Sequence, residues 1–298
     1  MQTVTADIIL FAFKRADHLQ RTLASLASNA EASASSLTIY CDGARGSEDE
    51  AGVAAVREAA AKATGFREVR TVSRDANMGL AGSVVAGVGE ALERSDRVIV
   101  VEDDLQVAPH FLRYMNDALD EYAEEERVAS IHGWRFPTRR ALPDTFFIRG
   151  ADCWGWATWR RAWPLYEPDG SKLLAQLEER RLTRAFDLDG SYPFTAMLRD
   201  QIAGRNNSWA VRWHAACFLA DRLTLHPGRS LVHNIGNDGS GTHSLKQNRY
   251  DTALFEGILP VGGIAIEESD VGRHAMAESL RSSPLRRAAR WLRRKARR

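Results

Sequence analysis

A run of four β-branched residues near the middle of the chain limits the possible fold more than any other feature. Residues 98–101 (Val-Ile-Val-Val) do not alternate between apolar and polar side chains, so a strand made from them must be buried on both faces. Such strands occur in sheets that helices cover on both sides. The run therefore predicts a central strand over residues 97–101 in an α/β protein.

Strand and helix patterns alternate through the first half of the chain, which is typical of a mostly parallel sheet flanked by helices. We expect strands at residues 8–13, 37–41, 68–72 and 97–101. We expect helices after Asp17 as N-cap, at residues 48–63 and 79–92, and from Pro109 to Tyr122.

The composition of the sequence changes after residue 131, where tryptophans, arginines and expected loops become frequent. Trp159 and Trp163 are expected on the core face of one helix. We find no internal repeat and no low-complexity linker before residue 280, so we expect one continuous domain in two parts. The seam between the parts is expected near residues 133–150.

Bulk composition excludes several classes of protein. With 44% hydrophobic and 27% charged residues, the chain has the composition of a soluble globular protein. No segment approaches the roughly 20 apolar residues of a membrane span, and the N-terminus does not read as a secretory signal. Cys41, Cys153 and Cys217 suggest neither a disulfide framework nor a zinc site. We therefore expect a cytoplasmic protein.

The end of the chain, residues 281–298, differs in charge from the rest. It contains nine of the 40 basic residues and no acid, which leaves 31 basic against 39 acidic residues elsewhere. Residues 284–298 form an amphipathic pattern that suits an anionic membrane surface, at the inner face of the membrane; a disordered basic end is the alternative. Nucleic-acid binding is not expected, because no binding module is visible and the remaining chain is acidic.

Polar residues follow the ends of the predicted strands, where open α/β sheets bind their ligands. The central strand is followed by Glu102, Asp103 and Asp104. Three carboxylates at the end of a buried strand repel one another, so a cation should compensate them. Mg²⁺ or Mn²⁺ is the natural candidate, because these ions prefer carboxylate and phosphate oxygens. The alternative is an acidic helix N-terminus before Pro109.

The segment Val100–Phe111, VVEDDLQVAPHF, resembles the VEDDLEVAPDFF segment of the N-acetylglucosaminyltransferases that initiate complex N-glycans. The likeness extends over about residues 5 to 245, including Phe146-Phe147, Trp154-Gly155-Trp156 with Trp163, Glu167 and Pro168, and Gly241-Thr242-His243. More broadly, the chain resembles bacterial family 2-like glycosyltransferases of the GT-A type.

That resemblance implies a Rossmann-like GT-A fold with a tryptophan-rich acceptor side. Residues 1–132 would form the nucleotide-sugar-binding half, residues 133–280 the acceptor-binding and catalytic half, and residues 281–298 the basic tail. The implied reaction moves a sugar from a nucleotide diphosphate, with a UDP-sugar as first choice, to a glycan, lipid-linked or protein acceptor. The implied stereochemistry is inversion, with assistance from the metal.

The resemblance also implies roles for single residues on the donor side. Asp104 would bind the metal, with Glu102 and Asp103 as donor contacts, and His243 would complete the metal shell or touch phosphate. The donor pocket would further include Asp42, Asn77 and Gly79. Arg15 is expected in the same pocket because it follows the end of the first strand. Asp42 and Asn77 also fit simple turns, and His243 also fits a surface histidine without a ligand role.

The acceptor side is predicted from aromatic and acidic residues. Trp154 and Trp156 could form an apolar platform under a sugar ring, although packing is the common role of a single tryptophan. Inverting transfer needs a carboxylate that takes the proton of the acceptor hydroxyl, and the candidates are Asp152, Asp187, Asp189 and Asp200. We favour Asp200, then Asp152, against the alternative that Asp200 is a solvated helix residue beside Arg199.

Similar transferases often place this base at the start of a helix that here follows Asn206-Asn207-Ser208, and an amide cannot act as a base. A non-catalytic carbohydrate- or nucleotide-binding protein is therefore an alternative. A sugar-nucleotide nucleotidyltransferase is another, but it should have a glycine-rich loop after the first strand, and residues 11–15 contain no glycine. A dehydrogenase fails because the glycines of residues 79–89 do not form GxGxxG.

Overall fold

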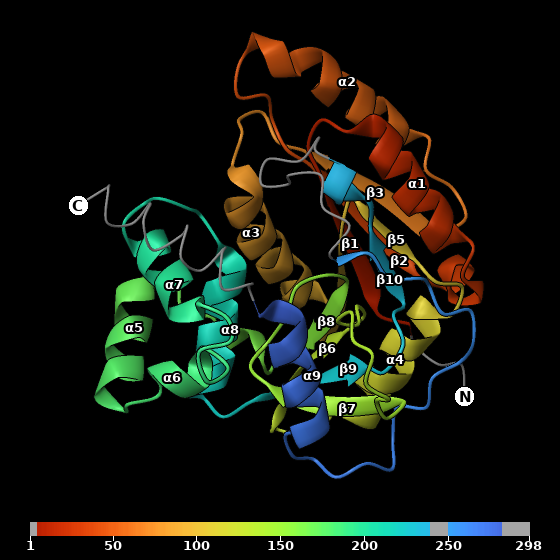
Figure 1. Cartoon of the computed structure of the whole chain (residues 1–298). Helices are drawn as coiled ribbons and strands as arrows, with labels where there is room; N and C mark the ends of the chain where they lie inside the picture. Colours follow the sequence, from red (N-terminus) through yellow and green to blue (C-terminus); the bar gives the residue numbers. More distant parts are fainter. Residues whose placement is uncertain (1–4, 239–249, 282–298) are drawn as a thin grey trace.

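The computed structural model describes residues 5–238 and 250–281, in which eight strands form one mixed, mostly parallel sheet (Figure 1). The strand order is β3-β2-β1-β4-β8-β6-β9-β7. The first four strands, which are parallel to one another, are β1 (Asp7–Ala12), β2 (Ser36–Cys41), β3 (Glu68–Ser73) and β4 (Arg97–Glu102). The predicted α/β class is thus confirmed, and the sheet is compatible with a Rossmann-like arrangement.

The second half of the chain completes the same sheet with mixed directions. Strand β8 (Trp156–Trp159) lies antiparallel between β4 and β6 (Val128–His132), β9 (Leu223–Pro227) is parallel to β6, and β7 (Thr145–Arg149) forms the edge. As a result, the carboxyl ends of β4, β6 and β9 and the start of β8 lie along one edge of the sheet, the edge that is formed by the ends of the strands. A short ribbon of β5 (Leu105–Val107) and β10 (Val232–Asn234) continues from that edge.

Helices cover both faces of the sheet, as the buried central strand requires. Helices α1 (Ala16–Ala27), α2 (Ser47–Ala61) and α4 (Phe111–Glu121) share one apolar core with one face of β1 and β4. Helices α3 (Gly79–Arg94) and α8 (Trp209–Leu219) share another core with the opposite face. Residues 98–101 of β4 are at most 1% exposed, which confirms the predicted central strand.

The boundaries expected in the first half agree with the structure within two residues, but two local predictions are wrong. Asp17 lies in the first turn of α1 and does not cap it, since the N-cap position is Arg15. Trp159 and Trp163 do not share a helix: Trp159 ends β8, and Trp163 begins the 3-10 helix η2 (Trp163–Leu165). The spacing of these two tryptophans is typical of a helix. In the structure, however, residues 156–159 form backbone hydrogen bonds with β4 and β6 as strand β8.

The remaining helices connect or flank the sheet. They are η1 (Ala30–Ala34), α5 (Gly170–Glu179), α6 (Thr183–Phe186), α7 (Phe194–Ile202), η3 (Ile235–Asp238) and α9 (Asp270–Leu280). Helices α5 to α8 bury a third apolar cluster among themselves and form a group beside the sheet (Figure 1).

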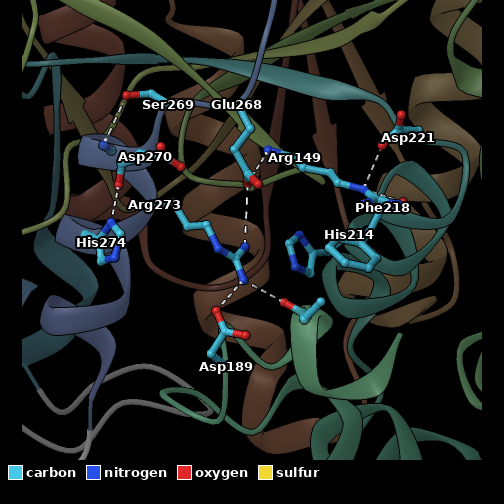
Figure 2. A network of polar contacts seen from close by, with 12 residues as sticks. Arg149, Asp189, His214, Phe218, Asp221, Glu268, Ser269, Asp270, Arg273 and His274 are labelled. Carbon is cyan, nitrogen blue, oxygen red and sulfur yellow. Dashed lines mark hydrogen bonds and ion pairs between the residues drawn. The ribbon is translucent and has the colours of Figure 1, made fainter. Parts of the chain in front are cut away.

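A polar network fixes this helical group against α9 and the edge strand β7 (Figure 2). Arg273 of α9 forms ion pairs with Asp189 at 3.0 Å and with Glu268 at 3.6 Å. Glu268 also accepts a hydrogen bond from the backbone N–H of Arg149 at 3.0 Å. The Arg149 side chain in turn pairs with Asp221, beyond the end of α8, at 3.0 Å. The network therefore links three separate parts of the second half.

Candidate functional site

The acidic triplet lies where the order of the parallel strands reverses. The chain runs outward from β1 through β2 to β3 and then returns to place β4 on the other side of β1. The backbone of Asp103 donates to the carbonyl of Phe11 at 3.0 Å, and its own carbonyl accepts from the Thr22 hydroxyl at 2.7 Å. The carbonyl of Asp104 accepts from the N–H of Ile235 at 2.8 Å. The triplet is thus held by β1, α1 and η3.

Arg15, the residue before α1, compensates two of the three acids. Its Nη2 donates to the carboxylates of Asp103 and Asp104, and the distance to Asp104 is 2.8 Å. The other terminal nitrogen, Nη1, is buried and has no hydrogen-bond partner among the described residues. A Cβ on Gly236 would lie 2.1 Å from Asp104 Oδ2 and 3.0 Å from Arg15 Nη1, so the backbone passes directly over this ion pair.

The triplet retains excess negative charge despite Arg15. Burial, together with the charges of Asp104 and Asp103, raises the pKa of Glu102 to about 8. Burial also raises the pKa of Asp103 to about 6, although Arg15 opposes this shift. Because Glu102 is mostly protonated at pH 7, one guanidinium faces two carboxylates, and the remaining negative charge makes the site attractive to a further cation. The sequence predicted compensation by a metal, whereas in the structure part of that compensation comes from Arg15.

A cavity of about 120 Å³ opens beside the triplet. Its lining includes Phe13, Arg15, Asp42, Leu80, Glu102 and Asp103. Pockets for whole drug-sized ligands have about 300 to 1,000 Å³, so this cavity is large enough for only part of a nucleotide sugar. It nevertheless brings together residues that the sequence analysis predicted on the donor side.

Asp42 holds the loop that leads into α3. Its carboxylate accepts hydrogen bonds from the N–H groups of Met78 at 2.8 Å and Gly79 at 3.0 Å, and from the Asn77 side chain at 3.0 Å. Gly79 has φ of +68°, a conformation that favours glycine. The structure therefore gives Asp42, Asn77 and Gly79 a turn role, while Asp42 also lines the cavity.

The loop of residues 150–155, between β7 and β8, approaches the triplet from the other half of the sheet. Burial and the charges of Asp152, Glu102 and Asp104 raise the pKa of Cys153 well above its ordinary value, so the thiol is within electrostatic range of these carboxylates. Asp152 is itself partly exposed, and burial raises its pKa. Of the candidate bases, Asp152 is thus the one whose neighbour in the sequence senses the charge of the triplet.

Three buried histidines lie near Asp152 on the side towards the protein interior. They were not predicted from the sequence. His132 Nε2 lies 3.8 Å from the Asp152 carboxylate, and His132 Nδ1 lies 3.2 Å from His226 Nδ1. His214 contacts the backbone of Ala151. Burial lowers the pKa of His132 to about 3 and of His214 to about 4, and it lowers that of His226 well below its ordinary value. All three are therefore neutral at pH 7.

These histidines should make the protein sensitive to acid. Below pH 6.5 the unfolded chain binds protons at His132, His214 and His226, whereas the folded chain does not, so stability is lost as pH falls towards the folded pKa values. Each histidine contributes a slope of about 1.4 kcal/mol per pH unit, and the raised pKa values of Glu102, Asp103 and Asp152 act in the opposite direction.

Urea unfolding between about pH 5 and pH 7 tests this expectation. The variant His226→Gln should reduce the slope of unfolding free energy against pH by about 1.4 kcal/mol per unit. His274→Gln, which removes an exposed imidazole on α9, serves as the control. Equal slopes in the wild type and in His226→Gln would contradict the assignment of a neutral buried His226.

The two tryptophans predicted to form a platform have different environments. Trp154 is partly exposed and packs edge-on against Trp134 at 4.7 Å and Tyr250 at 5.9 Å between ring centroids. Trp156 is only 1% exposed and stacks on Trp209 at 5.4 Å. The platform prediction is wrong for Trp156, because strand β8 directs this side chain into the core.

No protein-family model matches this chain. A search of curated proteins finds no match either. What the protein does must therefore be argued from the site itself.

Asp200, the favoured base, lies on α7 within the helical group. Arg205 donates to its carboxylate from Nε at 2.8 Å and from Nη2 at 2.6 Å. The two remaining candidates also have local partners: Asp187 accepts from the N–H of Thr195, and Asp189 pairs with Arg273. Their ion pairs and hydrogen bonds belong to the helical group and its junction with α9, whereas Asp152 lies in the loop before β8, the strand that pairs with β4.

Two further sequence predictions lie outside the described residues, namely His243 and the amphipathic segment 284–298. Within residues 5–238 and 250–281, no group of three or more His, Cys, Asp or Glu side chains is arranged to hold a metal by itself. A divalent ion that bridges protein and diphosphate needs only one or two protein carboxylates, so a site of that kind does not require such a group. No described helix combines the length and the apolar character needed to cross a membrane.

Proposed function

We propose that this chain is a GT-A glycosyltransferase that moves a sugar from a nucleotide diphosphate donor to an acceptor. The first choices are a UDP-sugar as donor and a glycan, lipid-linked or protein acceptor. The observation on which the proposal rests is the position of Glu102, Asp103 and Asp104 at the strand-order reversal between β1 and β4. Doubly wound sheets bind nucleotides at this kind of switch point, outside the carboxyl ends of the strands.

The charges of the site fit a divalent cation together with a diphosphate. The carboxylates of Asp103 and Asp104 face one guanidinium beside a mostly protonated Glu102, and Arg15 Nη1 has no partner among the described side chains. Asp104 is the carboxylate we assign to Mg²⁺ or Mn²⁺, because its side chain is more exposed than that of Asp103, at 15% against 5%. Such an ion, when bound, neutralises the charge that develops on the departing diphosphate.

The protein's own groups supply orientation and proton transfer in this proposal. Arg15 fixes the two aspartates, and its free nitrogen is available to an anionic donor oxygen. Asp152 takes the proton of the acceptor hydroxyl as that oxygen attacks the anomeric carbon, while the bond to the diphosphate breaks on the opposite face. The raised pKa of Asp152 brings this carboxyl closer to neutral pH, which suits a general base.

A non-catalytic binding protein is the second candidate, and one observation favours it. The segment before α8 has a capping structure: the Ser208 side chain accepts from the N–H of Val211, and the Asn206 side chain accepts from the N–H of Ser208. No carboxylate is available there, at the place where similar transferases often have their base. Turnover of a bound donor distinguishes the two candidates.

A thermal-shift panel of nucleotide sugars, with and without Mn²⁺, tests the proposed function. The true donor should stabilise the protein by about 2.7 kcal/mol at a hundredfold excess over its Kd, and the effect should require the metal. Free sugars and nucleoside monophosphates are the controls. Stabilisation without hydrolysis or transfer would support the binding protein, and the absence of any shift across the panel would contradict both candidates.

A further inference from the structure

A second and larger cavity, of about 1030 Å³, lies farther along the same edge of the sheet. It is lined by the loop 135–144 after β6, by residues 228–230 after β9, by the segment 251–255 and by the end of α9. Because β6 and β9 run in the same direction as β4, these loops lie at the edge that also holds the acidic triplet. The volume is that of a site for a whole ligand.

The lining of this cavity has an excess of uncompensated positive charge. Arginines at positions 135, 139, 140 and 229 face acids at positions 144, 251 and 278. Glu278 pairs with Arg140 at 2.5 Å, and Asp251 pairs with His233 at 3.1 Å. Among the described residues no ion pair engages the other three arginines, so their three charges face the two acids Asp144 and Asp251.

Arg135 and Arg229 form the centre of this positive charge. The backbone N–H of Arg135 donates to the hydroxyl of Ser230, the residue after Arg229, at 3.1 Å, and both arginines line the cavity. Burial and the charge of Arg229 lower the pKa of Arg135. Arg135 Nε is buried without a hydrogen-bond partner in the described structure, and its Nη2 reaches only two carbonyl oxygens, at 3.3 and 3.5 Å. The Arg229 guanidinium lies 4.7 Å from the centre of the Phe255 ring. Two like charges with unused donors are a binding site for an anion.

Aromatic side chains connect this cavity to the neighbourhood of Asp152. Trp134 precedes Arg135 in the sequence, and Tyr250 precedes Asp251, so both adjoin the cavity lining. The two rings contact each other at 6.1 Å, and both contact Trp154, which follows Asp152 and Cys153. Trp134 is buried, whereas Trp154 and Tyr250 are partly exposed, so a ligand in the cavity could extend over these two rings towards the loop that contains Asp152.

We propose that this cavity binds an oxyanion, a carboxylate or phosphate borne by a sugar chain, through Arg135 and Arg229. The role of that chain as acceptor rests on the proposed function, whereas the anion site itself does not. Arginine forks match the two oxygens of carboxylates and phosphates, which distinguishes such a chain from a neutral glycan.

Binding should be measured on the full chain without donor and without metal, by calorimetry and tryptophan fluorescence. The probes are inorganic phosphate, glucose 6-phosphate, glucuronate and glucose. Glucose should not bind, and the stronger of glucose 6-phosphate and glucuronate identifies the oxyanion. Arg229→Gln and Arg135→Gln should each weaken binding by about tenfold or more. Arg184→Gln, which removes an exposed arginine on α6 outside the cavity, should not.

Arg229 is exposed, so Arg229→Gln tests the proposal even if Arg135→Gln fails to fold. Absence of anion binding by the wild type, or an equal loss in Arg184→Gln, would overturn the inference. Anion binding without a metal-dependent donor shift would leave this site standing and reject the glycosyltransferase proposal. A metal-dependent donor shift without anion binding would support the glycosyltransferase proposal and reject the anion site.

Discussion

Replacing Asp104 with alanine should reduce metal-dependent turnover of the nucleotide-sugar donor by about a thousandfold and leave the fold intact. The expected loss is large because the variant removes the carboxylate assigned to the metal, and electrostatic stabilisation of a leaving diphosphate is worth several kcal/mol. The fold should persist because the side chain lies at a strand end and bonds to Arg15, which Asp103 continues to hold. Donor hydrolysis and transfer with Mn²⁺, together with a thermal melt, measure both effects.

Glu124→Ala is the matched control, because it removes an exposed carboxylate between α4 and β6. It should retain wild-type turnover. Asp104→Asn provides a second variant that preserves shape while removing the charge. Unchanged turnover in both Asp104 variants would exclude this carboxylate as the metal ligand.

Asp152→Asn should reduce transfer by about a hundredfold to ten-thousandfold while donor and metal binding stay close to wild type. The amide oxygen can still accept the hydrogen bond from the N–H of Cys153, now at 2.8 Å, so the loop should keep its conformation. The amide cannot take a proton, which is the function we assign to this carboxylate. Single-turnover rates with a saturating donor, compared with the donor-induced thermal shift, separate chemistry from binding.

Asp200→Asn is the informative comparison for the same experiment, since the sequence favoured Asp200 as base. This variant removes the negative charge of the Asp200–Arg205 ion pair on the helical group and should leave the rate of transfer near that of the wild type. The opposite pattern, with loss in Asp200→Asn and full activity in Asp152→Asn, would assign the base to Asp200.

The first half of the fold could be predicted from the sequence because its signals are local. A β-branched run without alternation requires burial on both faces, and residues 98–101 indeed lie between β1 and β8. The order of the second-half strands could not be predicted, because β8 pairs with β4 and β6 from distant parts of the chain. The short apolar run of β8 has the same pattern of residues as a buried segment of a helix, so periodicity does not distinguish the two.

The candidate site could be predicted only in part for a related reason. The acidic triplet is contiguous and therefore visible, but Arg15 becomes its partner only when β1 and β4 pair. His132, His214 and His226 come from β6, α8 and β9, and each alone resembles an ordinary core histidine. The positive cavity likewise needs Arg135 and Arg229 to meet across two loops.

The close passage of Gly236 over the Arg15–Asp104 pair connects the backbone of η3 to the charges of the acidic triplet. A methyl group at position 236 would meet the Asp104 carboxylate and the Arg15 guanidinium, so the side chains of this ion pair would have to shift to admit it. A substitution at position 236 would therefore act on the electrostatics of the triplet, from a position more than a hundred residues away in the sequence.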